Sequence, residues 1–194
     1  MESHTHITAF LLSGGKSTRM GTDKGMLPLN GKKLADHMIG LLDNLFSEIN
    51  IIANDPAYSE FNRPVYKDLY SDIGPLGGIY TGLTISKTPW NFFIACDMPF
   101  MTTDIISLMS DALDNNHDIV VSMNNNRFEP LCAFYNKTCM PVFKKQIEIE
   151  NFSLQKTIPL LNYKTVEVNN TLIETENPFL NLNTREEFSR YNTQ

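Results

Sequence analysis

The sequence predicts an α/β protein with a three-layer, doubly wound and mostly parallel sheet. Short apolar runs alternate along the chain with longer segments whose apolar residues recur at helical spacing. Such alternation is typical of a parallel sheet with helices on both faces. The 194 residues, of which 42% are hydrophobic, suffice for one substantial core, and no linker or internal repeat divides them. We therefore expect a single domain over residues 1–194.

The first expected strand, residues 7–12, is apolar throughout, as in a strand that is covered on both faces. The other expected strands are residues 49–53, 65–66, 91–96, 118–122, 131–135 and 164–168, of which 91–96 reads as the central one. The expected helices are residues 33–45, 75–86, 102–113, 138–146 and 184–191. Pro75 suits a first helical turn, and Thr184 with Glu187 has the spacing of a capping box. Residues 124–127 are expected to form a polar loop.

Composition excludes several classes of function. The net charge of −6 argues against nucleic acid as a partner, and no apolar run approaches the roughly 20 residues of a membrane span. The N-terminus lacks the apolar core of a signal peptide, so a cytoplasmic location is expected. Cys96, Cys132 and Cys139 lack metal-site spacing and are expected to be buried free thiols.

The loop after the first strand carries the strongest chemical signal. Gly14 and Gly15 follow the strand directly, and three cations follow them, Lys16, Arg19 and Lys24. Glycines let the backbone approach a ligand closely, and backbone N–H groups beside cations suit a polyphosphate. The loop does not fit the P-loop pattern G-x-x-x-x-G-K-[ST] or the dinucleotide pattern G-x-G-x-x-G. The sequence therefore predicts a nucleotide-phosphate site that belongs to neither class.

Asp97 directly follows the apolar strand 91–96, within Cys-Asp-Met-Pro. A carboxylate at the end of a buried strand contributes little to stability, whereas Mg²⁺ commonly binds one or two carboxylates together with substrate phosphates. Lys24 lies beyond the glycine turn, where its ammonium can reach toward a bound phosphate. Because ligands of such sheets bind beyond the carboxyl ends of the strands, we expect the glycine loop and Asp97 to converge.

The run Leu-Leu-Ser-Gly-Gly-Lys-Ser-Thr-Arg-Met-Gly-Thr-Asp-Lys at 11–24 resembles the nucleotidyltransferases, which transfer a nucleoside monophosphate from an NTP and release pyrophosphate. Within that superfamily the chain is most similar to the molybdenum cofactor guanylyltransferases (MobA). The Gly-Pro-Leu-Gly-Gly segment at 74–78 and the short length favour this group over sugar nucleotidyltransferases with extra domains. The resemblance implies one Rossmann-like nucleotidyltransferase domain of the GT-A type.

The resemblance also implies roles for individual residues. It assigns catalysis to Arg19, Lys24 and Asp97 and the Mg²⁺ cofactor to Asp97. The GTP-binding residues that it implies are Leu12, Ser13, Gly14, Gly15, Lys24, Asp68, Gly78 and Asp97. Arg127 and Asn183 match elements that face the second substrate or approach the phosphates. Around 52–54 the match leaves a guanine-reading asparagine unassigned.

The implied reaction joins GMP from GTP to molybdopterin. The partners implied are GTP and molybdopterin or the molybdenum cofactor, with other proteins of the cofactor pathway or molybdoenzyme chaperones, and neither nucleic acid nor a membrane. Two alternatives stay open at this point. One is a nucleotidyltransferase of the same fold that uses CTP with molybdopterin or acts on a sugar phosphate. The other is a nucleotide-binding protein without catalytic activity.

Overall fold

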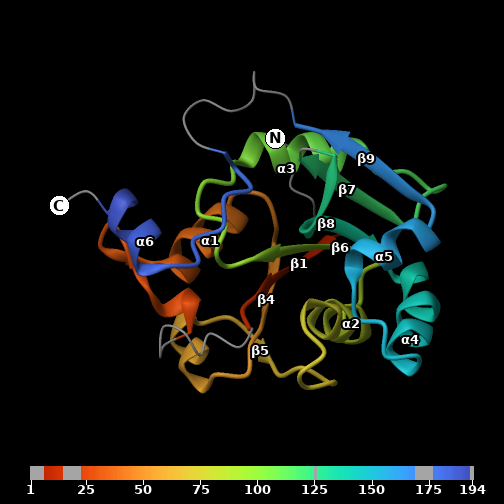
Figure 1. Ribbon diagram of the computed structural model, residues 1–194, viewed down its shortest axis with the longest axis horizontal. Helices are drawn as coiled ribbons and strands as arrows, with labels where there is room; N and C mark the ends of the chain where they lie inside the picture. Colours follow the sequence, from red (N-terminus) through yellow and green to blue (C-terminus); the bar gives the residue numbers. More distant parts are fainter. Residues whose placement is uncertain (1–6, 15–22, 125, 169–176, 193–194) are drawn as a thin grey trace.

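A central sheet of seven strands organises the computed structural model, which describes residues 7–14, 23–124, 126–168 and 177–192. Its order is β5 (Val65–Tyr66), β4 (Glu48–Ile52), β1 (Ile7–Leu12), β6 (Trp90–Ala95), β8 (Arg127–Asn136), β7 (Ile119–Asn124) and β9 (Tyr163–Glu167) (Figure 1). Only β8 among these runs antiparallel to its neighbours; all other pairs in this sheet are parallel. The expected mostly parallel sheet is confirmed, with β6 at its centre.

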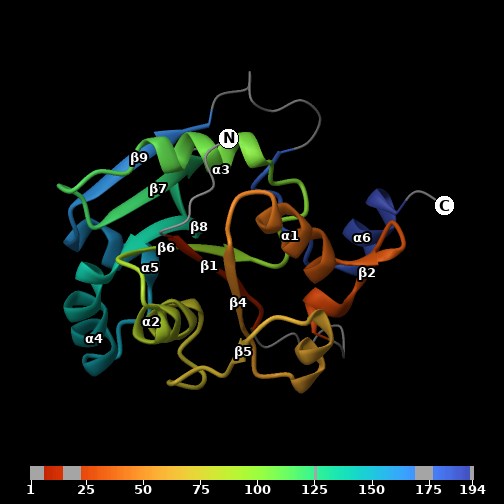
Figure 2. The ribbon, with the colours of Figure 1, turned by 180° about the vertical axis from the view of Figure 1, so that it is seen from behind.

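Helices cover both faces of this sheet, which gives the three layers that the sequence predicts (Figures 1 and 2). One face packs on α1 (Leu34–Asp43) and α3 (Thr103–Asp111). The other packs on α2 (Pro75–Ile85), α4 (Met140–Glu148) and α5 (Leu154–Thr157). In β1, Leu11 belongs to the first core and Phe10 to the second, because successive strand residues point to opposite faces. This explains why the strand is apolar at every position.

The C-terminal helix α6 (Arg185–Tyr191) lies beside the N-terminal part of the chain (Figure 1). Phe188 and Leu182 share a small core with Leu34 and with Leu29, a residue of the hairpin β2 (Pro28–Leu29) and β3 (Lys32–Lys33). Thr184 and Glu187 form the expected capping box at the start of α6. The packing of α6 brings the segment just before it, with Leu182 and Asn183, against Asp97 and Lys24.

The expected polar loop at 124–127 is wrong. Asn124 pairs with Arg127 in the ladder, so β7 and β8 form a hairpin with a tight turn, in which Asn126 has φ 60°. Polar residues suit such a turn, and for that reason composition alone suggests a longer loop. The expected helix at 138–146 instead begins as a 3₁₀ turn, η3 (Lys137–Cys139), and its α-helical part ends at Glu148. The short 3₁₀ helices η1 (Lys24–Met26), η2 (Pro56–Phe61) and η4 (Ile158–Leu160) were not among the expected helices.

The carboxyl ends of four parallel strands meet at one edge of the sheet. Leu12 of β1 lies opposite Ile52 of β4 and Ala95 of β6, and Ile52 lies opposite Tyr66 of β5. The chain turns from β1 to β4 on one side and later to β6 on the other, which makes this edge a topological switch point. Within the described ranges, no helix has the length and apolar character that crossing a membrane requires.

Candidate active site

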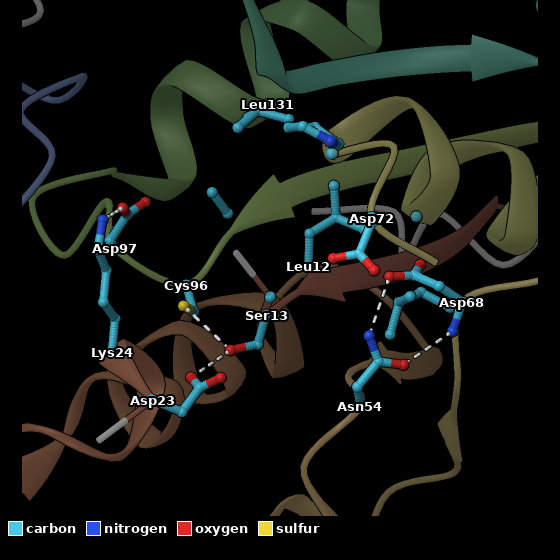
Figure 3. Close-up of a pocket in the computed structure, with 16 residues that line it drawn as sticks. Leu12, Ser13, Asp23, Lys24, Asn54, Asp68, Asp72, Cys96, Asp97 and Leu131 are labelled. Atoms are coloured by element: carbon cyan, nitrogen blue, oxygen red, sulfur yellow. Dashed lines mark hydrogen bonds and ion pairs between the residues drawn. The ribbon is translucent and has the colours of Figure 1, made fainter. Parts of the chain in front are cut away.

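A cavity of about 610 Å³ opens at this switch point. It is lined by residues from the ends of β1, β4, β5 and β6 and from the start of α2 (Figure 3). The lining residues include Leu12, Ser13, Gly14, Asp23, Lys24, Asn54, Asp68, Gly78, Cys96, Asp97 and Leu131. Its size is in the range of pockets that bind small molecules and cofactors.

Lys24 and Asp97 form an ion pair at one end of the cavity. Lys24 Nζ lies 3.0 Å from Asp97 Oδ2, and the two side chains are only 26% and 16% exposed (Figure 3). The same ammonium donates a hydrogen bond to the side-chain oxygen of Asn183. The segment before α6 is tied to this site a second time, because Leu182 N donates to the backbone oxygen of Asp97 at 3.1 Å. The segments after β6 and before α6 thus each place a side-chain oxygen beside the Lys24 ammonium.

Asp68 and Asn54 form the other end of the cavity (Figure 3). Asn54 Nδ2 donates to Asp68 Oδ2, and Asp68 N donates to Asn54 Oδ1, each at 3.3 Å. Asp68 Oδ1 is buried and has no hydrogen-bond partner among the described residues. Burial raises the pKa of this carboxyl, and the Asn54 hydrogen bond opposes that shift. A buried acceptor without a partner is costly, which fits an oxygen held ready for a ligand's N–H or O–H donor.

Two glycines keep the cavity open. No atom of the described residues would lie within 4 Å of a Cβ at Gly14, so none of them fills the space beside its backbone. A Cβ at Gly78, in the first turns of α2, would lie 3.1 Å from Leu12 Cδ2 and 3.5 Å from Asp68 Oδ1. Glycine at this position therefore lets α2 approach the end of β1 and the Asp68 carboxylate closely.

A hydrogen-bonded cluster, in which Ser13 and Tyr58 are buried and Asp23 is half-buried, adjoins Lys24. We call Ser13, Asp23 and Tyr58 the Asp23 cluster: the Ser13 hydroxyl lies 3.0 Å from Asp23 Oδ1, and the Tyr58 hydroxyl donates to the same oxygen. Ser13 Oγ also lies 3.3 Å from Cys96 Sγ. Burial raises the pKa of the Cys96 thiol to about 12, and the neighbouring Asp97 charge adds to the shift. This thiol is therefore protonated and a poor nucleophile at neutral pH.

The residues present at the Lys24 end fit a bound Mg²⁺. Asp97 supplies a hard carboxylate oxygen and Asn183 an amide oxygen, and both already face a cation, the Lys24 ammonium. The described residues contain no group of three or more His, Cys, Asp or Glu side chains that could hold a metal. A site of this kind needs oxygens from a substrate, as Mg²⁺ sites with one or two carboxylates and bound phosphates do.

Comparison with known proteins agrees with this geometry. The family model of the MobA-like NTP transferase domain matches residues 9–156. The chain belongs to that family. It is 34% identical over 194 residues to the molybdenum cofactor guanylyltransferase of Vibrio parahaemolyticus, a match that covers 96% of this chain and 95% of the relative. It is also 33% identical over 195 residues to a probable molybdenum cofactor guanylyltransferase of Natranaerobius thermophilus, with 95% and 94% covered.

The fold of this family is also seen in a crystal structure of molybdopterin-guanine dinucleotide biosynthesis protein A from Archaeoglobus fulgidus. That structure superimposes with a TM-score of 0.78 at 21% identity and covers 95% of this chain and 96% of that chain. Membership of this family makes the present chain an enzyme of the nucleotidyltransferase class.

Most of the predicted site residues lie together in this MobA-like enzyme. Seven of them line the one cavity: Leu12, Ser13, Gly14, Lys24, Asp68, Gly78 and Asp97. Asn183 joins them through Lys24. Gly15, Lys16 and Arg19 lie outside the described residues, so their roles stay predictions. Arg127 is exposed at the start of β8 and is not among the lining residues, whereas Leu131 of the same strand is.

Sequence reasoning missed Asn54 and Asp23, which line the cavity, and Tyr58, which contacts Asp23. Asn54 was left unassigned, although its place just after β4 put it at the same strand-end edge as Asp97. Tyr58 was not considered at all. The only local signal was the Asp-Pro pair at 55–56, which predicts a helix start but not what the tyrosine contacts.

Proposed function

We propose that this enzyme transfers GMP from GTP to molybdopterin and releases pyrophosphate, forming the guanine dinucleotide form of the cofactor. The observation that carries the proposal is the identity of 30–34% with relatives named molybdenum cofactor guanylyltransferase, over 94% or more of each chain. The cavity supports it. The Lys24–Asp97 end offers charge for phosphates, and the Asp68–Asn54 end offers acceptors and donors for a nucleoside.

The chemistry that these residues perform is positioning and charge neutralisation. A phosphate oxygen of molybdopterin forms a bond to the α-phosphorus of GTP, and the bond from that phosphorus to the α,β-bridging oxygen breaks. The bridging oxygen leaves with the electron pair as part of pyrophosphate. Because the attacking phosphate is already an anion, no side chain has to remove a proton. Lys24 places its ammonium where negative charge moves during transfer, and preorganised charge of this kind is a large part of catalysis.

We assign the Mg²⁺ of the reaction to Asp97, with Asn183 beside it. When bound, Mg²⁺ neutralises phosphate charge and keeps the triphosphate in line for attack. Asp97 also holds Lys24 in place through the 3.0 Å ion pair. Arg19 and Gly15 are proposed to contact the phosphates, and Arg127 is proposed to contact the second substrate. A role in the cytoplasm, with other cofactor-pathway proteins or molybdoenzyme chaperones as partners, also stays a prediction.

The experiment is a turnover assay with purified protein, GTP, Mg²⁺ and molybdopterin. We expect equimolar pyrophosphate and dinucleotide, and neither product when molybdopterin or Mg²⁺ is left out. Asp97→Asn keeps the size of the side chain but removes its charge, and we expect at least about a 1000-fold loss of kcat. Circular dichroism of that variant serves as the folding control. GTP binding without product would instead support a binding protein, and full activity of Asp97→Asn would remove the metal assignment.

A further inference from the structure

Tyr58 is fully buried although it belongs to a short helix at the surface. Its neighbours in η2, Ala57 and Ser59, are exposed, whereas the exposed fraction of Tyr58 is 0%. Asp55 and Pro56 set the helix start, because the Asp55 side chain accepts a hydrogen bond from Ala57 N at 2.9 Å. A buried tyrosine normally needs a partner for its hydroxyl. The question is what this hydroxyl contacts.

The Tyr58 hydroxyl is one of three hydrogen-bond donors to a single carboxylate oxygen. Asp23 Oδ1 accepts hydrogen bonds from the Tyr58 hydroxyl, from Ser13 Oγ at 3.0 Å and from Gly25 N at 3.1 Å. These donors come from η2, from the end of β1 and from η1. Charge-assisted hydrogen bonds to a carboxylate are stronger than neutral ones. The Asp23 side chain is therefore fixed from three directions.

Fixing Asp23 also fixes the start of the helix that carries Lys24. Asp23 is the N-cap of η1, and Lys24 is the first residue of that helix. Lys24 Nζ lies 3.0 Å from Asp97 Oδ2, and its position depends on where the first residue of η1 is placed. Tyr58 thus acts on the ion pair through two steps, the Asp23 carboxylate and the η1 cap, without touching either member of the pair.

The packing around Tyr58 leaves little room for the cluster to shift. A Cβ at Gly25 would collide with the Tyr58 hydroxyl and lie 3.1 Å from Ser13 Oγ. On the other side of η2, Lys33 Nζ pairs with Glu60 and lies 5.9 Å from the centre of the Phe61 ring. Phe61 in turn packs on Tyr58 with ring centres 5.6 Å apart. η2 therefore contacts both ends of the segment 23–33, through Tyr58 at Asp23 and through Glu60 at Lys33.

We propose that Tyr58 is a positioning residue for nucleotidyl transfer: its hydroxyl holds the Asp23 carboxylate so that Lys24 meets Asp97 at the α-phosphate position. The inference rests on the proposed function and adds to it a residue outside the cavity lining. Displacement of a catalytic group by about 1 Å can cost about 100-fold in rate. A small change at Tyr58 is therefore expected to reach the chemistry.

The first test is the steady-state kinetics of Tyr58→Phe, which keeps the ring and removes only the hydroxyl. We expect kcat for pyrophosphate release to fall about 10- to 100-fold, with a much smaller change in KM for GTP, because the lost effect acts mainly in the transition state. Tyr135→Phe is the matched control. Tyr135 is equally buried and its hydroxyl donates to Pro130 O at 2.8 Å, so the control loses one buried hydrogen bond outside the Asp23 cluster.

Kinetics well below the melting temperature separate the two roles of Tyr58. If Tyr58 has only a structural role, Tyr58→Phe should behave like Tyr135→Phe. Both changes would then lower Tm and leave kcat of the folded enzyme unchanged. Tyr58→Phe with kcat within about twofold of the Tyr135→Phe value, a factor worth roughly 0.4 kcal/mol, would overturn the positioning role.

The second test does not depend on turnover. Acylation of lysines by an N-hydroxysuccinimide ester, without nucleotide, is followed by peptide mass spectrometry, with exposed Lys144 as the internal reference. We expect Lys24 to be acylated several times faster in Tyr58→Phe than in the wild type, because its pairing with Asp97 loosens. An unchanged Lys24 rate would contradict the proposal. If the wild type releases no pyrophosphate from GTP, the proposed function fails, and the acylation rate alone decides on Tyr58.

Discussion

Lys24 and Asp97 lie 73 positions apart in the sequence, yet their charged atoms are 3.0 Å from each other at the carboxyl edge of the sheet. The contact exists because β1 and β6 are parallel neighbours, with Leu12 opposite Ala95, so the segments that follow them emerge together. An ammonium and a carboxylate that are both mostly buried are held for a purpose other than surface solvation. We propose that this ion pair arranges charge around a bound triphosphate.

Lys24→Met should abolish most of the activity and change stability little. Methionine keeps the length and apolar contacts of the side chain but removes the ammonium that faces Asp97 and Asn183. We expect kcat to fall about 100- to 1000-fold, the usual cost of removing one preorganised electrostatic group. Steady-state pyrophosphate release measures this. Lys144→Met, an exposed change on α4, is the control, and equal activity of the two variants would contradict the role of Lys24.

Asp68→Asn should raise thermal stability at neutral pH while it weakens GTP binding. Burial raises the pKa of Asp68 above its usual value of 3.8, so the folded protein holds this proton more tightly than the unfolded chain does. The resulting stability is present below pH 3.8 and is lost as pH rises through the raised pKa. At pH 7 the variant no longer buries the charge, and we expect Tm to rise by about 1–2 °C.

Melting curves of wild type and Asp68→Asn across pH check the sign of this effect. The difference in Tm should vanish in acid, where the wild-type carboxyl is protonated and resembles the amide. A variant that is less stable at pH 7 than the wild type would contradict the assignment of Asp68 Oδ1 as a buried acceptor that has no partner among the described residues.

Gly25→Ala should damage both stability and catalysis. Its Cβ would collide with the Tyr58 hydroxyl and crowd Ser13, and the buried surroundings cannot move apart cheaply. We expect Tm to fall by several degrees and kcat to fall at least as far as in Tyr58→Phe. Gly40→Ala is the control, because a Cβ at Gly40 of α1 would meet no atom of the described part of the chain within 4 Å. An active, stable Gly25→Ala protein would show that the Asp23 cluster tolerates displacement.

The three cysteines should be unreactive in the folded protein. Cys96, Cys132 and Cys139 are all buried, and burial raises the pKa of each thiol. Titration with Ellman's reagent at pH 8 should detect almost no thiol in the native state and all three after unfolding in guanidinium. Rapid reaction of one thiol in the native protein would mean that its site opens readily.

The sequence predicted the layers and the Lys24–Asp97 end of the site because their signals are local. An unbroken apolar strand predicts burial on both faces of the sheet. A charged residue directly after such a strand predicts that ligands bind at this edge of the sheet. Tyr58 could not be predicted in this way. Its role depends on how η2 packs against the end of β1. The contact joins Tyr58 to Ser13, 45 positions away in the sequence, and no periodic pattern predicts it. Arg127 stays a prediction, because it lies exposed at the start of β8 and no described contact tests its role.

The measurement that tests the account most directly is the ratio of kcat/KM for GTP to that for CTP, with molybdopterin and Mg²⁺ and the dinucleotide product identified by mass. We predict that GTP is preferred by at least about 100-fold, a difference of roughly 2.7 kcal/mol in transition-state binding. Equal or better use of CTP, or transfer to a sugar phosphate instead of molybdopterin, would contradict the assignment of this enzyme as a guanylyltransferase.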